Sequence, residues 1–231
     1  MRLDTREWGA GNRLAVLVHG LMSDHRTWDE LVPVLTGRGY RVLAVDLRGH
    51  GTSARGPYAP HLFAEDLVET LPRGAELALG HSLGALALSL AVEELRPERV
   101  VYSEPAWRLG GPDGVLDPAQ FVLFKRSPQL LVSMLRPGWP ESRVAAEVAA
   151  LRAWDEASAV ALSAHRAVDH TPEKAVVPSL VQVADPSTLV DAEMRAEFGR
   201  RGFTVRTVPG ATHAIHRDGL DTFVSCLAGW L

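Results

Sequence analysis

The sequence predicts an α/β protein with a mostly parallel, doubly wound sheet that is interrupted by a helical insert. Two observations predict it. Short apolar runs alternate with helical patterns along most of the chain, and one long stretch, residues 108–174, contains no good strand. The length of 231 residues suits one domain of the larger α/β kind. We therefore expect a core made of residues 1–107 and 175–231, with residues 108–174 forming a helical cap, or lid.

The expected strands are short runs rich in Val and Leu that do not alternate with polar residues. Such runs are typical of strands covered on both faces of a parallel sheet. They fall at residues 14–18, 41–46, 75–80, 99–104, 178–185 and 203–210. Segments with helical spacing lie between them, and Gly37 and Gly39 close the first. The expected core helices are 27–39, 60–71, 83–96, 189–201 and 217–231.

The insert shows only helical patterns, at residues 117–126, 128–135 and 141–166. Trp107 stands at its entrance, and Trp139 and Trp154 lie within it. Either these aromatic side chains pack the insert onto the core, or some of them line an apolar substrate pocket under a lid. The candidate pocket residues are Gly20, His81, Trp107, Trp139 and Trp154.

Composition argues against several classes of protein. The net charge of −4 and the pI near 6.1 indicate no basic face, so no nucleic-acid partner is expected. The single cysteine, Cys226, gives no disulfide framework. The N-terminus lacks the apolar segment of a signal peptide, and no apolar run is long enough to span a membrane. We expect a cytoplasmic protein without a membrane partner, and self-association into a homodimer stays open.

The motif GHSLG, residues 80–84, lies at the turn from strand 75–80 into helix 83–96. A tight strand-to-helix turn forces its middle residue into strained dihedrals, and side chains two positions before and after would clash. Both of those positions are glycine. The turn places the Ser82 hydroxyl at the carboxyl edge of the sheet, beside the free N–H groups of a helix start. We therefore predict that Ser82 is a nucleophile and that the Leu83 N–H binds an oxyanion.

Together with three further segments, this turn resembles the α/β-hydrolase family over nearly the whole chain. The segments are HGLMSDHRTW (19–28), DLRGHGTS (46–53) and GATHAIHRD (210–218). The resemblance implies an α/β-hydrolase fold with a helical cap. It also implies that the Leu21 N–H is the second oxyanion donor, that Gly20 lets backbone approach the substrate, and that His19 orders the loop. Asp46, Arg48 and His50 are expected to be structural.

The family order of serine, acid and histidine along the chain makes His213 the expected base. His216 lies three residues on, but no cluster of Asp, Glu or Cys supports a metal site there. The acid departs from the commonest pattern: the usual position holds Ser187, and Asp185 comes two residues early. Some members carry the acid at the end of the preceding strand, where this chain has Glu104. Glu104 is the first candidate for the acid and Asp185 is the alternative.

A serine nucleophile argues against epoxide hydrolase and haloalkane dehalogenase chemistry, in which a carboxylate attacks. With two N–H donors it suits hydrolysis of a small or medium carboxylic ester through an acyl-enzyme, without a cofactor. The insert is mostly apolar and its charges include Lys125, Arg126, Arg136, Arg143 and Arg152. The same residues would serve a thioesterase, a lactonase or a hydrolase of β-diketone C–C bonds. A non-catalytic ligand receptor on this fold remains the alternative from another class.

Overall fold

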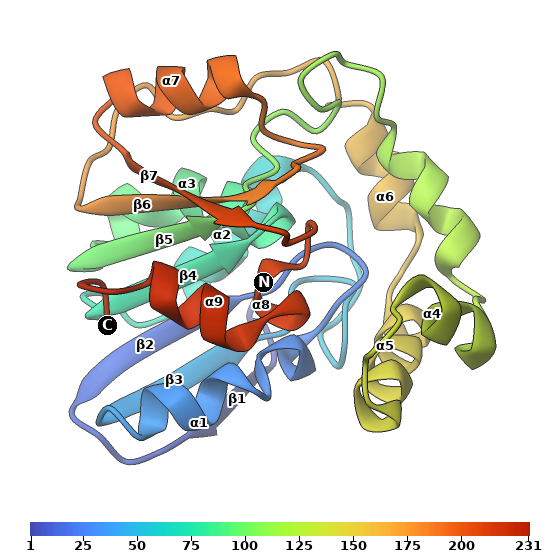
Figure 1. Ribbon diagram of the computed structural model, residues 1–231, viewed down its shortest axis with the longest axis horizontal. Coiled ribbons are helices and arrows are strands. Elements are labelled where there is room, and N and C mark those ends of the chain that lie inside the picture. Colours follow the sequence, from blue (N-terminus) through green and yellow to red (C-terminus); the bar gives the residue numbers. More distant parts are fainter.

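The computed structural model describes residues 1–231 and contains a seven-stranded sheet (Figure 1). The strands lie in the order β1-β3-β2-β4-β5-β6-β7, and every neighbouring pair is parallel except β1 and β3. Their bounds are β1 Thr5–Trp8, β2 Arg13–Val18, β3 Tyr40–Val45, β4 Leu77–His81, β5 Arg99–Ser103, β6 Ser179–Asp185 and β7 Thr204–Pro209. The expected mostly parallel sheet is confirmed.

Burial on both faces explains why the strands were recognisable as apolar runs. All five residues of β4 are buried, and β5 and β6 are buried at all but one position each. The antiparallel edge strand β1 was not expected, because its sequence TREW is polar and partly exposed. An edge strand is solvated along one side, so it needs no apolar run.

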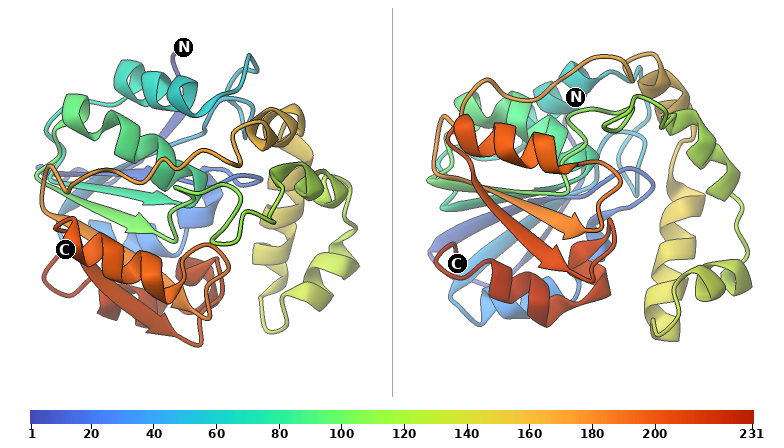
Figure 2. Two further views of the ribbon diagram at one scale, coloured as in Figure 1. Left: turned by 90° about the horizontal axis from the view of Figure 1, so that it is seen from above. Right: turned by 45° about the horizontal axis from the view of Figure 1, so that its top comes forward.

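Helices cover both faces of this sheet (Figures 1 and 2). The larger apolar cluster joins the sheet to α2, α3 and α7, and the second joins it to α1, α8 and α9. The bounds are α1 Leu31–Thr36, α2 Pro60–Thr70, α3 Leu83–Leu95, α7 Ala192–Arg200, α8 Ile215–Asp218 and α9 Leu220–Cys226. The expected helix 27–39 is shorter and follows a separate 3-10 turn, η1 His25–Trp28. The expected helix 217–231 is two short helices divided at Gly219. None of the helices has both the length and the apolarity that crossing a membrane requires.

We call residues 108–174 the cap. It stands beyond the carboxyl ends of the strands and contains helices but no β-strand (Figure 2). They are η2 Pro118–Phe124, α4 Gln129–Leu135, α5 Glu141–Ala153 and α6 Ala157–Ser163. The single helix expected at 141–166 is therefore wrong: Trp154 has an extended backbone, with ψ of 139°, and separates α5 from α6.

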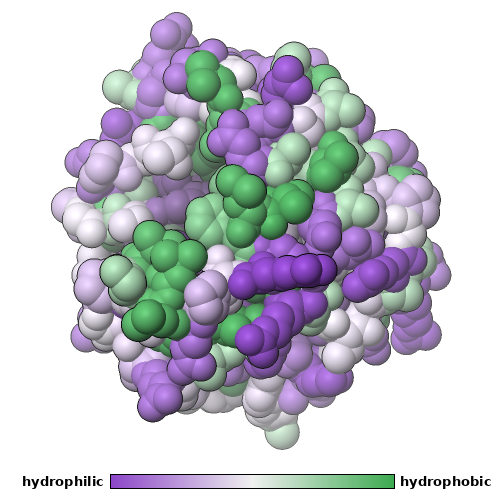
Figure 3. Space-filling model, turned by 90° about the vertical axis from the view of Figure 1, so that its right-hand side faces the viewer, coloured by the Kyte–Doolittle hydropathy of each residue, from purple (hydrophilic) through white to green (hydrophobic).

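The cap buries few of its own apolar side chains. Its separate hydrophobic cluster has four buried members, Val132, Val144, Val148 and Leu151. Nine of the eleven large hydrophobic residues that are exposed on the whole chain belong to the cap, so its helices form a thin layer rather than a second core. Apolar patches separated by hydrophilic side chains are visible on this side of the molecule (Figure 3).

Candidate active site

The turn at Ser82 has the strained geometry expected from the glycine spacing. Ser82 lies at φ 51° and ψ −116°, between the end of β4 and the first residue of α3. A Cβ on Gly80 would lie 2.7 Å from the Gly84 oxygen, and a Cβ on Gly84 would lie 2.3 Å from the His19 oxygen. Since real Cβ atoms do not approach oxygen that closely, only glycine fits both positions.

Hydrogen bonds from the neighbouring strand end hold this strained turn. The Ser82 N–H donates to the Ser103 carbonyl at 3.0 Å, and the Ala106 N–H donates to the Ser82 carbonyl at 3.2 Å. A strained residue costs about 1–3 kcal/mol and persists only when its surroundings fix it. The end of β5 therefore positions both Ser82 and Glu104, which is the residue that follows β5 in the chain.

Two backbone N–H groups near Ser82 have no partner within the protein. The Leu83 N–H is the first of α3, and neither it nor the Leu21 N–H donates a hydrogen bond to another group of the chain. Gly20 brings the Leu21 loop close: a Cβ there would lie 2.9 Å from His81 Nδ1 and 3.0 Å from Ser82 Cβ. The two predicted oxyanion donors, the N–H groups of Leu21 and Leu83, therefore have no hydrogen-bond partner in the chain, and the Gly20 loop lies close to Ser82.

His213 contacts Glu104. His213 Nδ1 lies 3.3 Å from Glu104 Oε2, although the two residues are 109 positions apart. The Glu104 side chain is fully buried, whereas the His213 side chain is 37% exposed and can reach a substrate. A buried carboxylate beside one ring nitrogen favours a proton on that nitrogen, which leaves the other nitrogen free to accept one.

Two further donors fix the Glu104 carboxylate. Its Oε1 accepts the Ala184 N–H at 2.7 Å, and its Oε2 accepts the Ser187 hydroxyl at 3.0 Å. Ser187 occupies the position where the family usually carries the acid. Here it instead donates a hydrogen bond to Glu104, which follows the neighbouring strand β5. Asp185 is exposed, and its side chain forms no hydrogen bond or ion pair with His213. The structure therefore brings Glu104, and not Asp185, to the ring.

Two more histidines lie near His213: His81 packs against it, and His216 packs against His81. The ring of His81 lies 4.7 Å from that of His213 and donates through Nε2 to the His213 carbonyl at 2.8 Å. His216 contacts His81 at 4.9 Å and pairs through Nε2 with Thr27 Oγ1 at 2.8 Å. Burial lowers the pKa of both His81 and His216 well below the usual value, so both stay neutral and add no charge beside the base.

His19 orders the loop before Leu21, as expected from the resemblance. Its Nδ1 donates to the Gly20 carbonyl at 2.7 Å, and its Nε2 accepts the Leu47 N–H at 3.0 Å. Burial lowers the pKa of His19. The ring therefore ties the loop after β2 to the turn after β3 in its neutral form.

The turn after β3 is held by buried polar contacts. The Arg48 guanidinium forms a two-point ion pair with buried Asp66, at 2.5 and 2.7 Å. Burial lowers the pKa of His50 to about 3, and its Nδ1 donates to the Arg48 carbonyl, so His50 does not compete as a base. Asp46 accepts the backbone N–H and ring N–H of His25. These contacts are structural, as the sequence indicated.

Asp24, His25 and Asp46 bring three potential metal ligands within 4.8 Å of one another. Both carboxylates already have protein partners. Asp24 is paired with the Arg26 guanidinium, and Asp46 accepts from His25 and Thr52. These hydrogen bonds give the three residues a structural role, because they join η1 to the turn after β3.

Trp107, at the entrance of the insert, and Trp139 and Trp154 within it have different surroundings. Trp107 is fully buried against Phe198 under α7, and its indole N–H donates to Ser89 Oγ at 3.0 Å, so the expectation that it lines the substrate pocket is wrong. Trp154 is also fully buried, and packs near His50. Both tryptophans therefore pack the insert onto the core, which is the first of the two roles considered for these aromatic side chains. Trp139 is partly exposed and lies against the small cap cluster.

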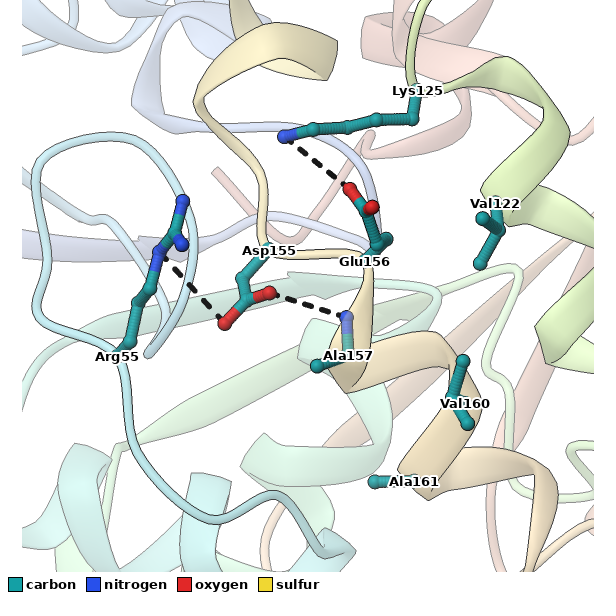
Figure 4. A pocket seen from close by; sticks show the side chains of 8 residues that line it. All are labelled: Arg55, Val122, Lys125, Asp155, Glu156, Ala157, Val160 and Ala161. Atoms are coloured by element: carbon teal, nitrogen blue, oxygen red, sulfur yellow. Dashed lines mark hydrogen bonds and ion pairs between the residues drawn. The ribbon is translucent and has the colours of Figure 1, made fainter.

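A cavity of about 700 Å³ opens between the cap and the loop after β3 (Figure 4). Its charged side chains are already paired, Arg55 with Asp155 and Lys125 with Glu156, each at 3.8 Å. The remaining lining residues are Val122, Ala157, Val160 and Ala161. None of the candidate catalytic residues lines it, so we assign the chemistry to the residues around Ser82 and not to this cavity.

Comparison with known proteins agrees with the fold. A model of the alpha/beta hydrolase family matches residues 15–225. Because this match covers most of the sequence, the chain belongs to the alpha/beta hydrolase family, a family of hydrolytic enzymes.

Two curated relatives match a shorter part. An esterase of Mycobacterium tuberculosis is 42% identical over 91 residues, which are 36% of this chain and 30% of the esterase. The 2-(acetamidomethylene)succinate hydrolase of Mesorhizobium japonicum is 39% identical over 88 residues, 36% of this chain and 31% of that enzyme. The chain therefore matches about a third of the length of these relatives.

Solved structures are similar over nearly the whole chain. The structure of an E-2-(acetamidomethylene)succinate hydrolase has a TM-score of 0.82 at 23% identity, covering 98% of this chain and 94% of that one. An enol-lactonase from Burkholderia xenovorans has a TM-score of 0.78 at 25% identity, covering 99% and 95%. These likenesses agree with the fold over nearly the whole chain.

Proposed function

We propose that the protein is a serine hydrolase that cleaves a small or medium carboxylic ester through an acyl-enzyme. The proposal rests on the contact between the buried Glu104 carboxylate and His213, at the same carboxyl end of the strands as the strained Ser82. The names of the curated relatives, an esterase and a hydrolase, support hydrolytic chemistry at such a site.

In the first half of the reaction Ser82 Oγ attacks the ester carbonyl carbon, and His213 Nε2 takes the hydroxyl proton. Glu104 accepts the Nδ1–H and stabilises the positive charge that develops on the ring. The carbonyl oxygen becomes an oxyanion, which the N–H groups of Leu21 and Leu83 stabilise. The imidazolium then gives its proton to the leaving oxygen, so the alcohol departs and the acyl group stays on Ser82.

In the second half, water attacks the acyl carbon and gives its proton to His213. The tetrahedral intermediate collapses, the carboxylic acid leaves, and the proton returns to Ser82 Oγ. The same five groups act in both halves of the reaction. Every atom that takes part in these steps comes from the chain, the ester or water.

A panel of p-nitrophenyl esters from acetate to dodecanoate tests the proposal, with Ser82→Ala as the matched variant. We expect turnover that depends on chain length and falls by at least about a thousandfold in the variant. A fluorophosphonate probe should label the parent at Ser82 and not the variant. Near-parent turnover by folded Ser82→Ala would refute the nucleophile, and no turnover together with no labelling would favour a ligand receptor.

A further inference from the structure

Three guanidinium groups gather around the ring of Trp139 at the edge of the cap. The guanidinium carbons of Arg136, Arg143 and Arg217 lie 5.3, 5.4 and 4.2 Å from the ring centroid. Arg217 belongs to α8, four residues after His213, so this cluster joins the cap to the segment that carries the base. An aromatic face attracts such cations and restricts their position.

Two of the three cations already have carboxylate partners. Arg143 pairs with Glu30, and Arg217 pairs with Glu147. Arg136 pairs with no carboxylate of the chain; its one polar contact to another side chain is from Nη1 to Thr212 Oγ1, at 3.4 Å. Such a distance is long for a hydrogen bond, so a better acceptor can replace the hydroxyl at little cost.

This unpaired cation contacts the residue that precedes the proposed base in the chain. Thr212 directly precedes His213, whose side chain is 37% exposed. The acid bonded to Thr212 is Asp218, whose Oδ2 accepts both the N–H and the hydroxyl of Thr212. Asp218 therefore binds Thr212 and leaves the guanidinium of Arg136 without an ionic partner.

We propose that Arg136 binds a carboxylate of the substrate, so that the enzyme acts on esters that carry a second, ionised carboxyl group. The inference rests on the proposed esterase function and names its substrate class. A guanidinium offers two parallel N–H donors that match a carboxylate. The contact of Arg136 with Thr212 is compatible with a carboxylate on the alcohol half or on the acyl half of the ester.

Matched pairs of esters test the assignment. The leaving-group pair is 4-acetoxybenzoate and its neutral methyl ester, and the acyl pair is monophenyl glutarate and phenyl butanoate. Each is assayed with the parent, Arg136→Gln, Arg136→Lys and Arg126→Gln. Arg126 is an exposed cap arginine without a hydrogen-bonding partner, so its variant has the same net charge as Arg136→Gln and serves as the control.

We expect Arg136→Gln to lower kcat/KM for the anionic ester of one pair by about tenfold to a hundredfold, the effect of losing one charge-assisted hydrogen bond. The neutral esters should change less than about twofold, Arg136→Lys should keep part of the selectivity, and Arg126→Gln should keep all of it. Selectivity of the parent should fall when ionic strength rises to about 0.5 M. An effect confined to the acyl pair would support the subsite and place the carboxylate on the acyl half.

Two results would overturn the inference while leaving the esterase function intact. One is equal loss on the anionic and neutral esters, which would mean that Arg136 only braces the cap. The other is that the parent hydrolyses neutral esters and that the Arg136 variants have the same preference between anionic and neutral esters as the parent. Failure of the function itself is distinguishable, because the parent would then hydrolyse neither pair and would not be labelled at Ser82.

Discussion

Replacing Glu104 by glutamine should remove most of the activity and leave the fold intact. The Ala184 N–H can only donate, so the new side-chain oxygen must occupy the Oε1 position, 2.7 Å from that N–H. The new NH₂ group then faces the Ser187 hydroxyl, which can accept, and His213 Nδ1. To accept this hydrogen bond the ring must carry its proton on Nε2, and it then cannot take the proton of Ser82.

The magnitude follows from the same geometry. At the 3.3 Å separation, Coulomb's law with an effective dielectric constant of about 20 gives about 5 kcal/mol between the carboxylate and the imidazolium. His213 is 37% exposed, so solvent screening reduces this to about 3 kcal/mol. That loss corresponds to about a hundredfold in kcat, and the wrong tautomer adds to it.

Asp185→Asn is the matched control, because it also removes one negative charge but its side chain forms no hydrogen bond or ion pair with His213. The assay is kcat and KM on one p-nitrophenyl ester, with circular dichroism and urea unfolding to verify the fold. We expect at least a hundredfold loss for Glu104→Gln and less than about twofold for Asp185→Asn. The reverse order, or a folded Glu104→Gln variant with parent activity, would refute the assignment of the acid.

Three other substitutions test how the site is held. Gly84→Ala places a Cβ 2.3 Å from a backbone oxygen, so we expect the free energy of unfolding in urea to fall by about 3 kcal/mol or more. A fall below about 1 kcal/mol would contradict the close packing of this turn. Arg48→Met leaves buried Asp66 without its main partner and should cost about 3–5 kcal/mol in the same assay, whereas an unchanged midpoint would mean that this pair contributes nothing. The hydrogen bond to Asp46 raises the pKa of His25, so the stability difference between the parent and His25→Asn should be full below the unfolded pKa of about 6.5 and should shrink as the pH rises through the raised value. Urea midpoints at several pH values measure it, and a difference that grows with pH would refute the sign.

Local signals explain which parts of the fold were predictable. The parallel strands are buried on both faces, so each appears as an apolar run without reference to the rest of the chain. Strand β1 lacks such a run because it lies at the edge, and its pairing with β3 is a tertiary contact. The division of α5 from α6 was also not predictable, because it depends on burial of Trp154 against the core and not on a helix-breaking residue.

The candidate site divides in the same way. Gly80, Ser82 and Gly84 lie within five residues, and the steric demand of one turn fixes all three, so the sequence alone indicated the nucleophile. The cap residue Arg136 gave no signal beyond its charge. Its place beside Thr212, 76 residues away, depends on how the cap packs on the core.

The sequence by itself determined the fold class, the strained turn and the order of the candidate residues, because these depend on spacing within single elements. Only the tertiary structure decided between Glu104 and Asp185. The pairing of Ser103 with Gln182 in β5 and β6 brings the end of β5 beside the Ala184 N–H, and the carboxylate that follows is buried there within reach of His213. A contact between residues 109 positions apart is set by strand order and register, and no local pattern encodes it.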